Sequence, residues 1–268
     1  MGFLVKAYFV IRKVFCLFAL ERRKRILELL NQNGSVLVND LSRDLQVTVE
    51  TIRRDLEKLE QSEQLTRTHG GAVPFEESNL DLSLEKRRGL NIEGKIAIAR
   101  KAVNHIRPGD TIFLDGSTTS YYLSKQLKDM KNITIITNNL QILEELSGCD
   151  KMKVISTGGV LDVNNQSFVG EVAVDNINKN FCANKIFFSS KGMTMEQGIL
   201  ESNDVEFQIK RAMLNNSMTK FLLLDKSKLE KVGFIKLSSF SEIDMLFTDE
   251  ELSEDWKKIL KKNKVTVE

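Results

Sequence analysis

Five apolar runs of this sequence are each followed by a short polar stretch that could hold an anion. In the most complete stretch, "DGSTTS", Gly116 permits a tight turn and the three hydroxyls after it can donate hydrogen bonds. A helix that follows such a turn adds free N–H groups and its positive dipole end. Lys191 and Lys228, in two other stretches, could neutralise a phosphate. The five stretches are Asp115 to Thr119, Thr137 to Asn139, Thr157 to Gly159, Ser189 to Gly192 and Asp225 to Lys228.

The same polar residues have a plainer interpretation, because a Ser or Thr after a strand is often a helix N-cap. Five polar strand ends at one edge of a sheet favour a binding site, since ligands of open α/β sheets bind outside the carboxyl ends of the strands. The sequence contains neither GxxxxGK[ST] nor GxGxxG. A small phosphorylated metabolite therefore fits better than a nucleotide.

The cysteines and histidines give no support for a metal centre or a disulfide framework. Cys16, Cys149 and Cys182 are odd in number and widely spaced, and His69 and His105 stand alone. Free thiols in a reducing cytoplasm are the simpler interpretation. We therefore predict a cytoplasmic protein with no metal and no cofactor.

A second group of residues that could bind a partner is the arginine pair in "TVETIRRDLEKLE", residues 48–60. At helical spacing Ile52, Leu56 and Leu59 form one apolar stripe. Arg54 falls opposite that stripe and Arg53 falls on its flank, so the pair does not pack into a core. Such a pair can be an ordinary solvated helix face. It can also contact the edges of guanine bases and phosphates.

The surrounding elements favour the second interpretation. Residues 21–34 and 38–47 predict two helices before the arginine-bearing one, which Thr48 would cap. The second and third of these helices fit a helix-turn-helix, in which early residues of the last helix reach base edges in the major groove. The following "QLTRTHGGAV" predicts a hairpin wing, where Arg67 and His69 could contact DNA.

The overall composition does not by itself indicate DNA binding. The 268 residues carry a formal net charge of +2, with 41% apolar and 28% charged residues, as in a globular protein of one or two domains. Acidic and basic side chains balance within residues 21–75. DNA binding must then depend on which face the charges occupy, and we expect a homo-oligomer, a dimer or tetramer, to bind paired half-sites.

The chain is predicted to have four parts. Residues 1–20 form an apolar leader outside the fold, too interrupted by Lys6, Arg12 and Lys13 to cross a bilayer, so we expect no stable membrane association. A helical extension and a weak interfacial anchor are the alternatives for it. Residues 21–75 form the DNA-binding domain and 76–93 a linker. Residues 94–268 alternate apolar runs with amphipathic segments, which predicts an α/β domain with a mostly parallel sheet.

The segment "VTVETIRRDLEKLEQSEQLTRTHGGAV" resembles the winged helix-turn-helix of the DeoR family of bacterial transcriptional regulators. The "TIRRDL" core and the "HGGAV" end, at this spacing, carry the resemblance. Glu63 stands where the family usually has a glycine before the wing, which could alter the turn there. The predicted DNA-binding residues are Thr48, Glu50, Thr51, Arg53, Arg54, Lys58, Arg67 and His69.

The resemblance continues through "GKIAIARKAV", "GDTIFLDGSTTS", "ITNNL", "GGVLDVNNQSFVG", "EFQIKRAM" and "LLLDKSK". It implies a Rossmann-like domain similar to sugar-phosphate isomerases and deaminases, with a phosphorylated sugar as effector. Ser189-Ser190 departs from the family's usual Gly-Ala, and Glu206 and Lys210 could instead be a surface ion pair. The predicted effector-binding residues are Asp115, Gly116, Ser117, Thr118, Thr119, Asn138, Gly159, Lys191, Glu206, Lys210 and Lys228.

These patterns together predict a transcriptional repressor of sugar-metabolism genes that a phosphorylated sugar releases from operator DNA. An isomerase or deaminase with an attached DNA-binding domain is the alternative, with Asp115 or Glu206 as its proton-transferring carboxylate. A regulator whose second domain only forms oligomers is a third possibility. No enzyme motif accompanies the shared fold, so we predict that the chain is not an enzyme.

Overall fold

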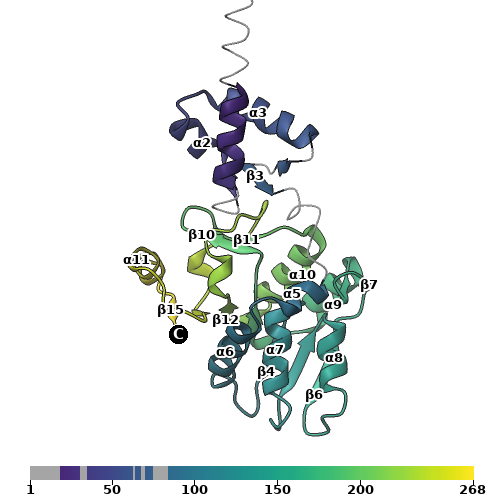
Figure 1. Ribbon diagram of the computed structural model, residues 1–268. Helices are drawn as coiled ribbons and strands as arrows, with labels where there is room; N and C mark the ends of the chain where they lie inside the picture. Colours follow the sequence, from purple (N-terminus) through teal and green to yellow (C-terminus); the bar gives the residue numbers. More distant parts are fainter. Residues whose placement is uncertain (1–18, 31–34, 63, 68–69, 75–83) are drawn as a thin grey trace, which may run out of the picture. The chain divides into compact units, whose positions relative to one another are not determined.

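The computed structural model describes residues 19–30, 35–62, 64–67, 70–74 and 84–268 (Figure 1). They form two units, Met1–Asp81 and Leu82–Glu268. Of the predicted leader, residues 1–18 lie outside the described residues, and residues 19 and 20 are part of a helix that covers 19–30. Among the described residues, no helix is long and apolar enough to span a membrane.

The N-terminal unit is a winged helix-turn-helix, which confirms the predicted fold. The helix over residues 19–30 precedes the helix-turn-helix, and a three-stranded antiparallel sheet of order β1-β3-β2 forms the wing. The first strand is only two residues long, too short for a periodic pattern to predict. The elements are β1 (Val36–Leu37), α2 (Val38–Asp44), α3 (Val49–Gln61), β2 (Leu65–Arg67) and β3 (Gly71–Pro74).

The core of this unit explains why the helices pack as they do. Ile52, Leu56 and Leu59 of α3 are buried together with Ile26 and Leu41, as the apolar stripe predicts. A side chain on Gly71 would place its Cβ 1.8 Å from the Val36 carbonyl oxygen, so only glycine lets β3 pair with β1. Gly71 of the "HGGAV" sequence is therefore a requirement of the wing sheet.

One buried carboxylate fixes the first helix against α3. Asp55, on the buried side of α3, lies 2.5 Å from Arg22 Nε and 3.7 Å from Arg23 Nε. A buried carboxylate needs such partners, because desolvating it alone costs several kcal/mol. Two arginines of the N-terminal unit are thus paired within the unit itself.

The C-terminal unit is built on a seven-stranded parallel sheet of order β15-β14-β12-β9-β4-β5-β6. The five apolar runs that precede the polar stretches all form strands of this sheet, namely β4, β5, β6, β9 and β12. Chain order reverses between β4 and β9, which creates a topological switch point at their carboxyl ends. The strands are β4 (Thr111–Leu114), β5 (Thr134–Thr137), β6 (Lys153–Ser156), β9 (Ala183–Phe188), β12 (Ser217–Leu223), β14 (Met245–Phe247) and β15 (Thr266–Val267).

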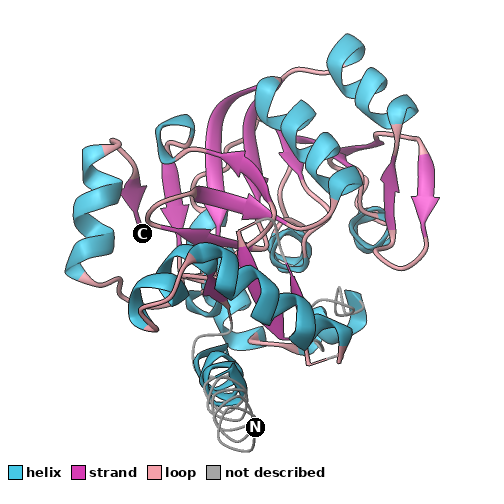
Figure 2. Cartoon of the chain, turned by 90° about the horizontal axis from the view of Figure 1, so that it is seen from above, coloured by secondary structure: helices cyan, strands magenta, loops and turns pink. Residues whose placement is uncertain are grey.

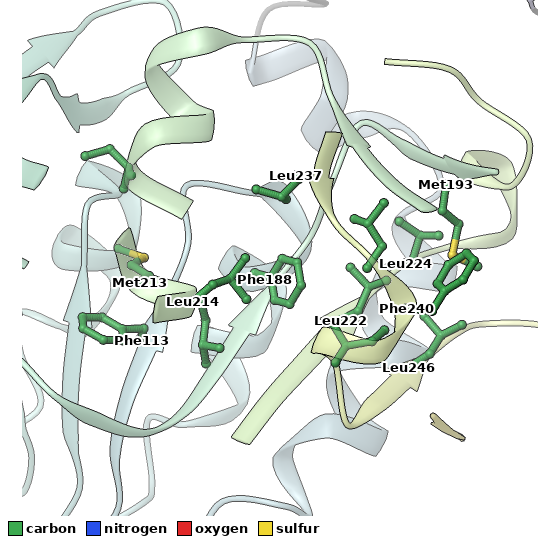
Figure 3. Close-up of a cluster of buried hydrophobic side chains, with 14 of the residues drawn as sticks. Phe113, Phe188, Met193, Met213, Leu214, Leu222, Leu224, Leu237, Phe240 and Leu246 are labelled. Carbon is green, nitrogen blue, oxygen red and sulfur yellow. The ribbon is translucent and has the colours of Figure 1, made fainter. Parts of the chain in front are cut away.

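Helices cover both faces of this sheet (Figure 2). Because side chains alternate along a strand, each strand contributes to two cores. Phe113, Phe188 and Leu222 pack with α9, α10 and α11 on one face (Figure 3), and Phe187 and Leu223 pack with α6, α7 and α8 on the other. The helices are α6 (Ile92–Val103), α7 (Thr118–Gln126), α8 (Leu140–Leu146), α9 (Glu171–Asn180), α10 (Asp204–Asn215) and α11 (Glu254–Lys262).

Several shorter elements were not predicted. Two are antiparallel sheets separate from the parallel sheet. One is a hairpin of β7 (Val160–Asp162) and β8 (Ser167–Val169), and the other has three strands, β10 (Gly192–Thr194), β11 (Gly198–Glu201) and β13 (Ile235–Ser238). Helix α5 (Leu84–Gly89) and the start of α6 fall in the segment predicted as a linker, residues 76–93. The structure therefore places the second half of that segment within the α/β unit.

Candidate functional site

Asp115 organises the loop that follows β4. Its side chain is fully buried, and its Oδ1 atom accepts hydrogen bonds from the hydroxyls of Ser117 (2.6 Å) and Ser120 (2.5 Å). Its Oδ2 atom accepts one from the backbone N–H of Ser189 after β9, at 3.1 Å. The Asp115 carboxylate thus joins the two strand ends at the switch point, and both of its oxygens are occupied.

The "DGSTTS" loop is both a helix cap and a set of free donors. Ser117 caps α7, because its hydroxyl accepts the backbone N–H of Ser120 at 3.1 Å. The backbone N–H groups of Gly116, Thr118 and Thr119 have no acceptor among the described residues. These three groups lie at the positive end of the α7 dipole, an arrangement that suits an anion.

Three buried side-chain atoms next to this loop have no hydrogen-bond partner among the described residues. They are Thr119 Oγ1, Asn138 Oδ1 and Glu206 Oε2. A Cβ on Gly116 would lie 3.1 Å from Glu206 Oε2 and 3.5 Å from Asn138 Nδ2, so two of these side chains approach the glycine directly. Unpaired buried polar atoms each cost about 1–3 kcal/mol, and such a group of them is typical of a ligand site.

Lys210 is a cation whose charge is already matched. Its Nζ lies 2.5 Å from Glu201 Oε2 and 3.5 Å from Asp115 Oδ2. Burial alone would lower the Lys210 pKa, but the nearby carboxylates of Glu201, Asp115 and Glu206 together raise it above its ordinary value. The alternative of a Glu206–Lys210 surface ion pair is wrong, because both side chains are buried and Lys210 pairs with Glu201 and Asp115.

Glu206 is a buried carboxyl group with one oxygen that has no hydrogen-bond partner among the described residues. Burial raises its pKa, while the Lys210 charge and a hydrogen bond from the Ser167 hydroxyl to Oε1 act in the opposite direction. A carboxyl oxygen can accept a hydrogen bond from a hydroxyl group. The unpartnered Oε2 atom of Glu206 is therefore suited to a ligand hydroxyl.

Lys228 is a second cation near the Asp115 loop, and its charge is poorly compensated. Its Nζ donates to Ser189 Oγ and to the Ser190 carbonyl oxygen, each at 2.9 Å. Burial lowers the Lys228 pKa to about 8, and Asp225 offsets only part of that effect. Within the described part of the chain it forms no ion pair with a carboxylate at 4 Å or less. An incoming anion would supply the missing negative charge.

Two predicted effector-binding residues are not joined to the others by a hydrogen bond or ion pair among the described residues. Gly159 has φ +112°, and a Cβ there would meet the Val169 carbonyl oxygen at 2.6 Å, so local packing accounts for this glycine. Lys191 is half-buried, and its backbone N–H donates to the Leu200 carbonyl oxygen. Their role in effector binding remains a prediction.

Sequence reasoning missed three residues of this network. Ser120 had a usable signal, since it lies three residues after the Ser117 cap. Glu201 and Ser167 lie in the unpredicted antiparallel strands β11 and β8. No local pattern distinguishes these two from ordinary polar residues.

The predicted DNA-binding face lies on α3. The side chains of Arg53 and Arg54 are 59% and 74% exposed, and each lies within 4 Å of Glu50, an exposed residue one turn earlier. Thr48 caps the helix, accepting the Thr51 N–H at 3.2 Å, and the two hydroxyls lie 2.8 Å apart. The arginines are therefore presented to solvent from a capped helix.

The structure describes some of the other predicted DNA-binding residues. Lys58 is exposed on α3, and Arg67 in β2 is exposed with its guanidinium 3.9 Å from Glu60. His69 and Glu63 lie outside the described residues. Exposed pairs of this kind are weak in water, so a phosphate could replace Glu50 or Glu60 as the partner at little cost.

An exposed arginine pair on a helix-turn-helix, together with a buried polar site at an α/β switch point, defines a ligand-responsive DNA-binding regulator. The family models agree: the DeoR-like helix-turn-helix domain matches residues 22–78, and the DeoR C terminal sensor domain matches residues 90–250. The chain belongs to the DeoR family of transcriptional regulators. This confirms the predicted family, and with it the prediction that the chain is a regulator and not an enzyme.

Several relatives share nearly the whole chain. The uncharacterized HTH-type transcriptional regulator YulB of Bacillus subtilis is 38% identical over 92% of this chain and 95% of that protein. The L-fucose operon activator of Haemophilus influenzae is 35% identical over 88% and 94%. The glycerol-3-phosphate regulon repressor of Escherichia coli is 31% identical over 85% and 90%.

Among solved structures, a D-ribose-5-phosphate isomerase in complex with phospho-erythronic acid is 14% identical, with a TM-score of 0.39 over 52% of this chain and 54% of that one. At this TM-score the likeness adds nothing to the fold assignment, which rests on the observed strand order.

We expect Arg54→Ala to weaken binding to operator DNA by about 1–3 kcal/mol, because it removes an exposed positive charge from the helix that is predicted to enter the groove. The thermal midpoint should stay nearly unchanged, since the side chain has no buried contact. Fluorescence anisotropy with labelled operator measures the affinity. Arg100→Ala, which removes an exposed charge from the sensor, is the control; a large loss of stability in Arg54→Ala would show a structural role instead.

We expect Lys210→Met to destabilise the α/β unit by about 3–5 kcal/mol, because it leaves Glu201 and Asp115 buried without their cation. Adding Glu201→Gln should recover part of that loss. Urea unfolding followed through Trp256, the one tryptophan of the chain and a buried residue of α11, reports on this unit. Lys179→Met breaks an exposed pair with Asp175 and should change stability by less than about 0.5 kcal/mol.

Proposed function

We propose that this regulator represses sugar-metabolism genes and leaves its operator when a phosphorylated sugar or polyol binds beside Gly116. One observation carries the proposal: unpartnered buried atoms of Thr119, Asn138 and Glu206 meet free backbone N–H groups at the start of α7. A ligand with an anionic end and hydroxyl groups would satisfy both sets at once.

The phosphate would occupy the N-terminus of α7. The N–H groups of Gly116, Thr118 and Thr119 supply donors, and Lys228 supplies a positive charge that forms no ion pair within 4 Å among the described residues. Lys210 contributes less, because Glu201 and Asp115 already neutralise it. The phosphate thus binds mainly through backbone donors and one lysine.

The sugar hydroxyls would pair with Asn138 Oδ1 and Glu206 Oε2. These atoms are buried and unpartnered, so a ligand lacking hydroxyl groups would leave them unsatisfied and bind more weakly. The position of Glu206 against Gly116 keeps this hydroxyl contact close to the phosphate end. A compact phosphorylated sugar or polyol matches this spacing.

Relatives act in both directions, since they include a glycerol-3-phosphate regulon repressor and an L-fucose operon activator. We assign repression because a repressor needs only its contacts with the operator. Effector binding then has only to oppose those contacts. The near-neutral DNA-binding domain favours a homo-oligomer on paired half-sites. Action on chromosomal DNA implies a cytoplasmic location.

A thermal-shift screen of the full chain against sugar phosphates and their dephosphorylated parents tests the proposal. We expect a phosphorylated member alone to stabilise the protein, by about 2.7 kcal/mol at 100 times its Kd. Gly116→Val should abolish the shift because a side chain there would crowd Glu206, whereas Gly148→Val, with open space around it, should not. No stabilisation by any member would favour a domain that only forms oligomers.

Effector affinity should fall as pH rises through about 8. Lys228 is protonated below this pKa, and a bound phosphate dianion favours the protonated form, so binding weakens once the proton is lost. Between pH 7.5 and 9.5 the phosphate charge is constant and Kd should rise roughly tenfold. Titration calorimetry measures this slope. Lys228→Arg keeps its charge throughout the window and should flatten the profile; an equally steep profile would remove Lys228 from the site.

A further inference from the structure

Helix α5 is the first element of the α/β unit, and residues 75–83 join it in sequence to the DNA-binding domain. A change in how α5 is held therefore changes the position at which the chain enters the α/β unit. Leu84 is the one apolar side chain in α5, and it is buried. The remaining described attachments of α5 are polar, so the helix can detach at a lower cost than a core helix.

Two neighbouring arginines hold α5 to different parts of the unit. Arg87 Nη2 donates to Asn165 Oδ1 at 2.5 Å, in the turn between β7 and β8. The Arg88 guanidinium lies 4.4 Å from the centre of the Tyr121 ring and donates to the Tyr121 hydroxyl at 3.1 Å. Tyr121 is in α7, the helix that begins at the proposed phosphate site.

The turn that binds Arg87 is itself ordered. Asn165 is buried, and its Nδ2 donates to Asp162 Oδ2 at 2.9 Å. Asp162 Oδ1 accepts the Asn164 backbone N–H at 3.0 Å. The acceptor of Arg87 is therefore held in one orientation by the hairpin that contains it.

The next strand, β8, is attached to the proposed effector site. The Ser167 hydroxyl donates to Glu206 Oε1. The Phe168 N–H donates to the Asn138 carbonyl oxygen at 2.7 Å, and Asn138 Nδ2 donates to the Phe168 carbonyl oxygen at 3.3 Å. Glu206 and Asn138 are the same residues whose other polar atoms lack partners. One short strand thus contacts both hydroxyl-binding candidates, and its preceding turn contacts α5.

We propose that the β7–β8 hairpin transmits effector binding to α5, with Asn165 and Arg87 as the positioning residues that join the hairpin to the helix. A ligand on Glu206 and Asn138 fixes those side chains and with them β8. The ordered turn then holds Arg87, and α5 stays docked. Without ligand the hairpin is held less firmly and α5 detaches more often. This coupling rests on the proposed function for its ligand, but the contacts that carry it exist in the protein without ligand.

Hydrogen–deuterium exchange of the full chain, read by mass spectrometry over residues 84–90, tests the coupling without any ligand. Asn165→Ala removes the Asn165 Oδ1 acceptor of Arg87 and should speed exchange at residues 84–90 about tenfold. Ser167→Ala does not touch α5, yet it loosens β8 and should speed exchange at 84–90 about threefold. Asn164→Ala, the neighbouring asparagine with its N–H retained, should leave the rate unchanged. Arg87→Gln is a second variant should Asn165→Ala fail to fold.

An increase for both Asn165→Ala and Ser167→Ala, with Asn164→Ala at the wild-type rate, supports the hairpin as the coupling element. Wild-type exchange at 84–90 in Ser167→Ala overturns it and leaves the other contacts of α5 as its attachments, among them those of Arg88 with Tyr121 and of Lys95 with the Arg87 carbonyl oxygen. Equal acceleration in Asn164→Ala also overturns it, because any change in the turn would then suffice. No ligand is added, so a failed effector screen and a failed coupling are distinguishable.

Discussion

The buried carboxylate of Asp115 is the interaction on which the sensor site depends. It is fully buried at the carboxyl end of β4, where it accepts hydrogen bonds from the start of α7 and from the backbone after β9. Lys210 from α10 lies 3.5 Å away and keeps the carboxylate from being an isolated buried charge. One charge thereby holds together two strands and two helices at the switch point, and the donors at the α7 terminus are positioned as a result.

The two lysines near Asp115 differ in what they can still do. Lys210 is matched by Glu201 and Asp115, so its charge serves the architecture. Among the described residues, Lys228 donates to Ser189 and Ser190 and to no carboxylate, and burial lowers its pKa. The DNA-binding unit shows the same division: Arg22 and Arg23 hold Asp55, whereas Arg53 and Arg54 face solvent. In both units, some basic side chains neutralise buried carboxylates of the fold, and others remain available to bind a partner.

The sequence predicted what local periodicity encodes. The stripe of Ile52, Leu56 and Leu59, and the apolar runs that became parallel strands, identified both domains because buried faces have regular spacing. Strands β7, β8 and β11 lie in antiparallel pairs joined by short turns, outside the alternation of apolar runs and amphipathic segments, so they were missed together with Ser167 and Glu201. Spacing of i and i+4 suggested that Glu206 pairs with Lys210, but tertiary packing gave Lys210 other partners. Where an ion pair forms in a folded core depends on elements distant in sequence.

The central claim is that occupation of the sensor site and binding of operator DNA oppose each other. By thermodynamic linkage, an effector that lowers DNA affinity by some factor must itself bind more weakly to the DNA complex by the same factor. The measurement is the operator Kd at saturating effector and the effector Kd at saturating operator, on the same preparation and at one salt concentration. Equal reductions of about 5-fold to 150-fold are expected. An operator Kd that does not change at saturating effector would contradict the account.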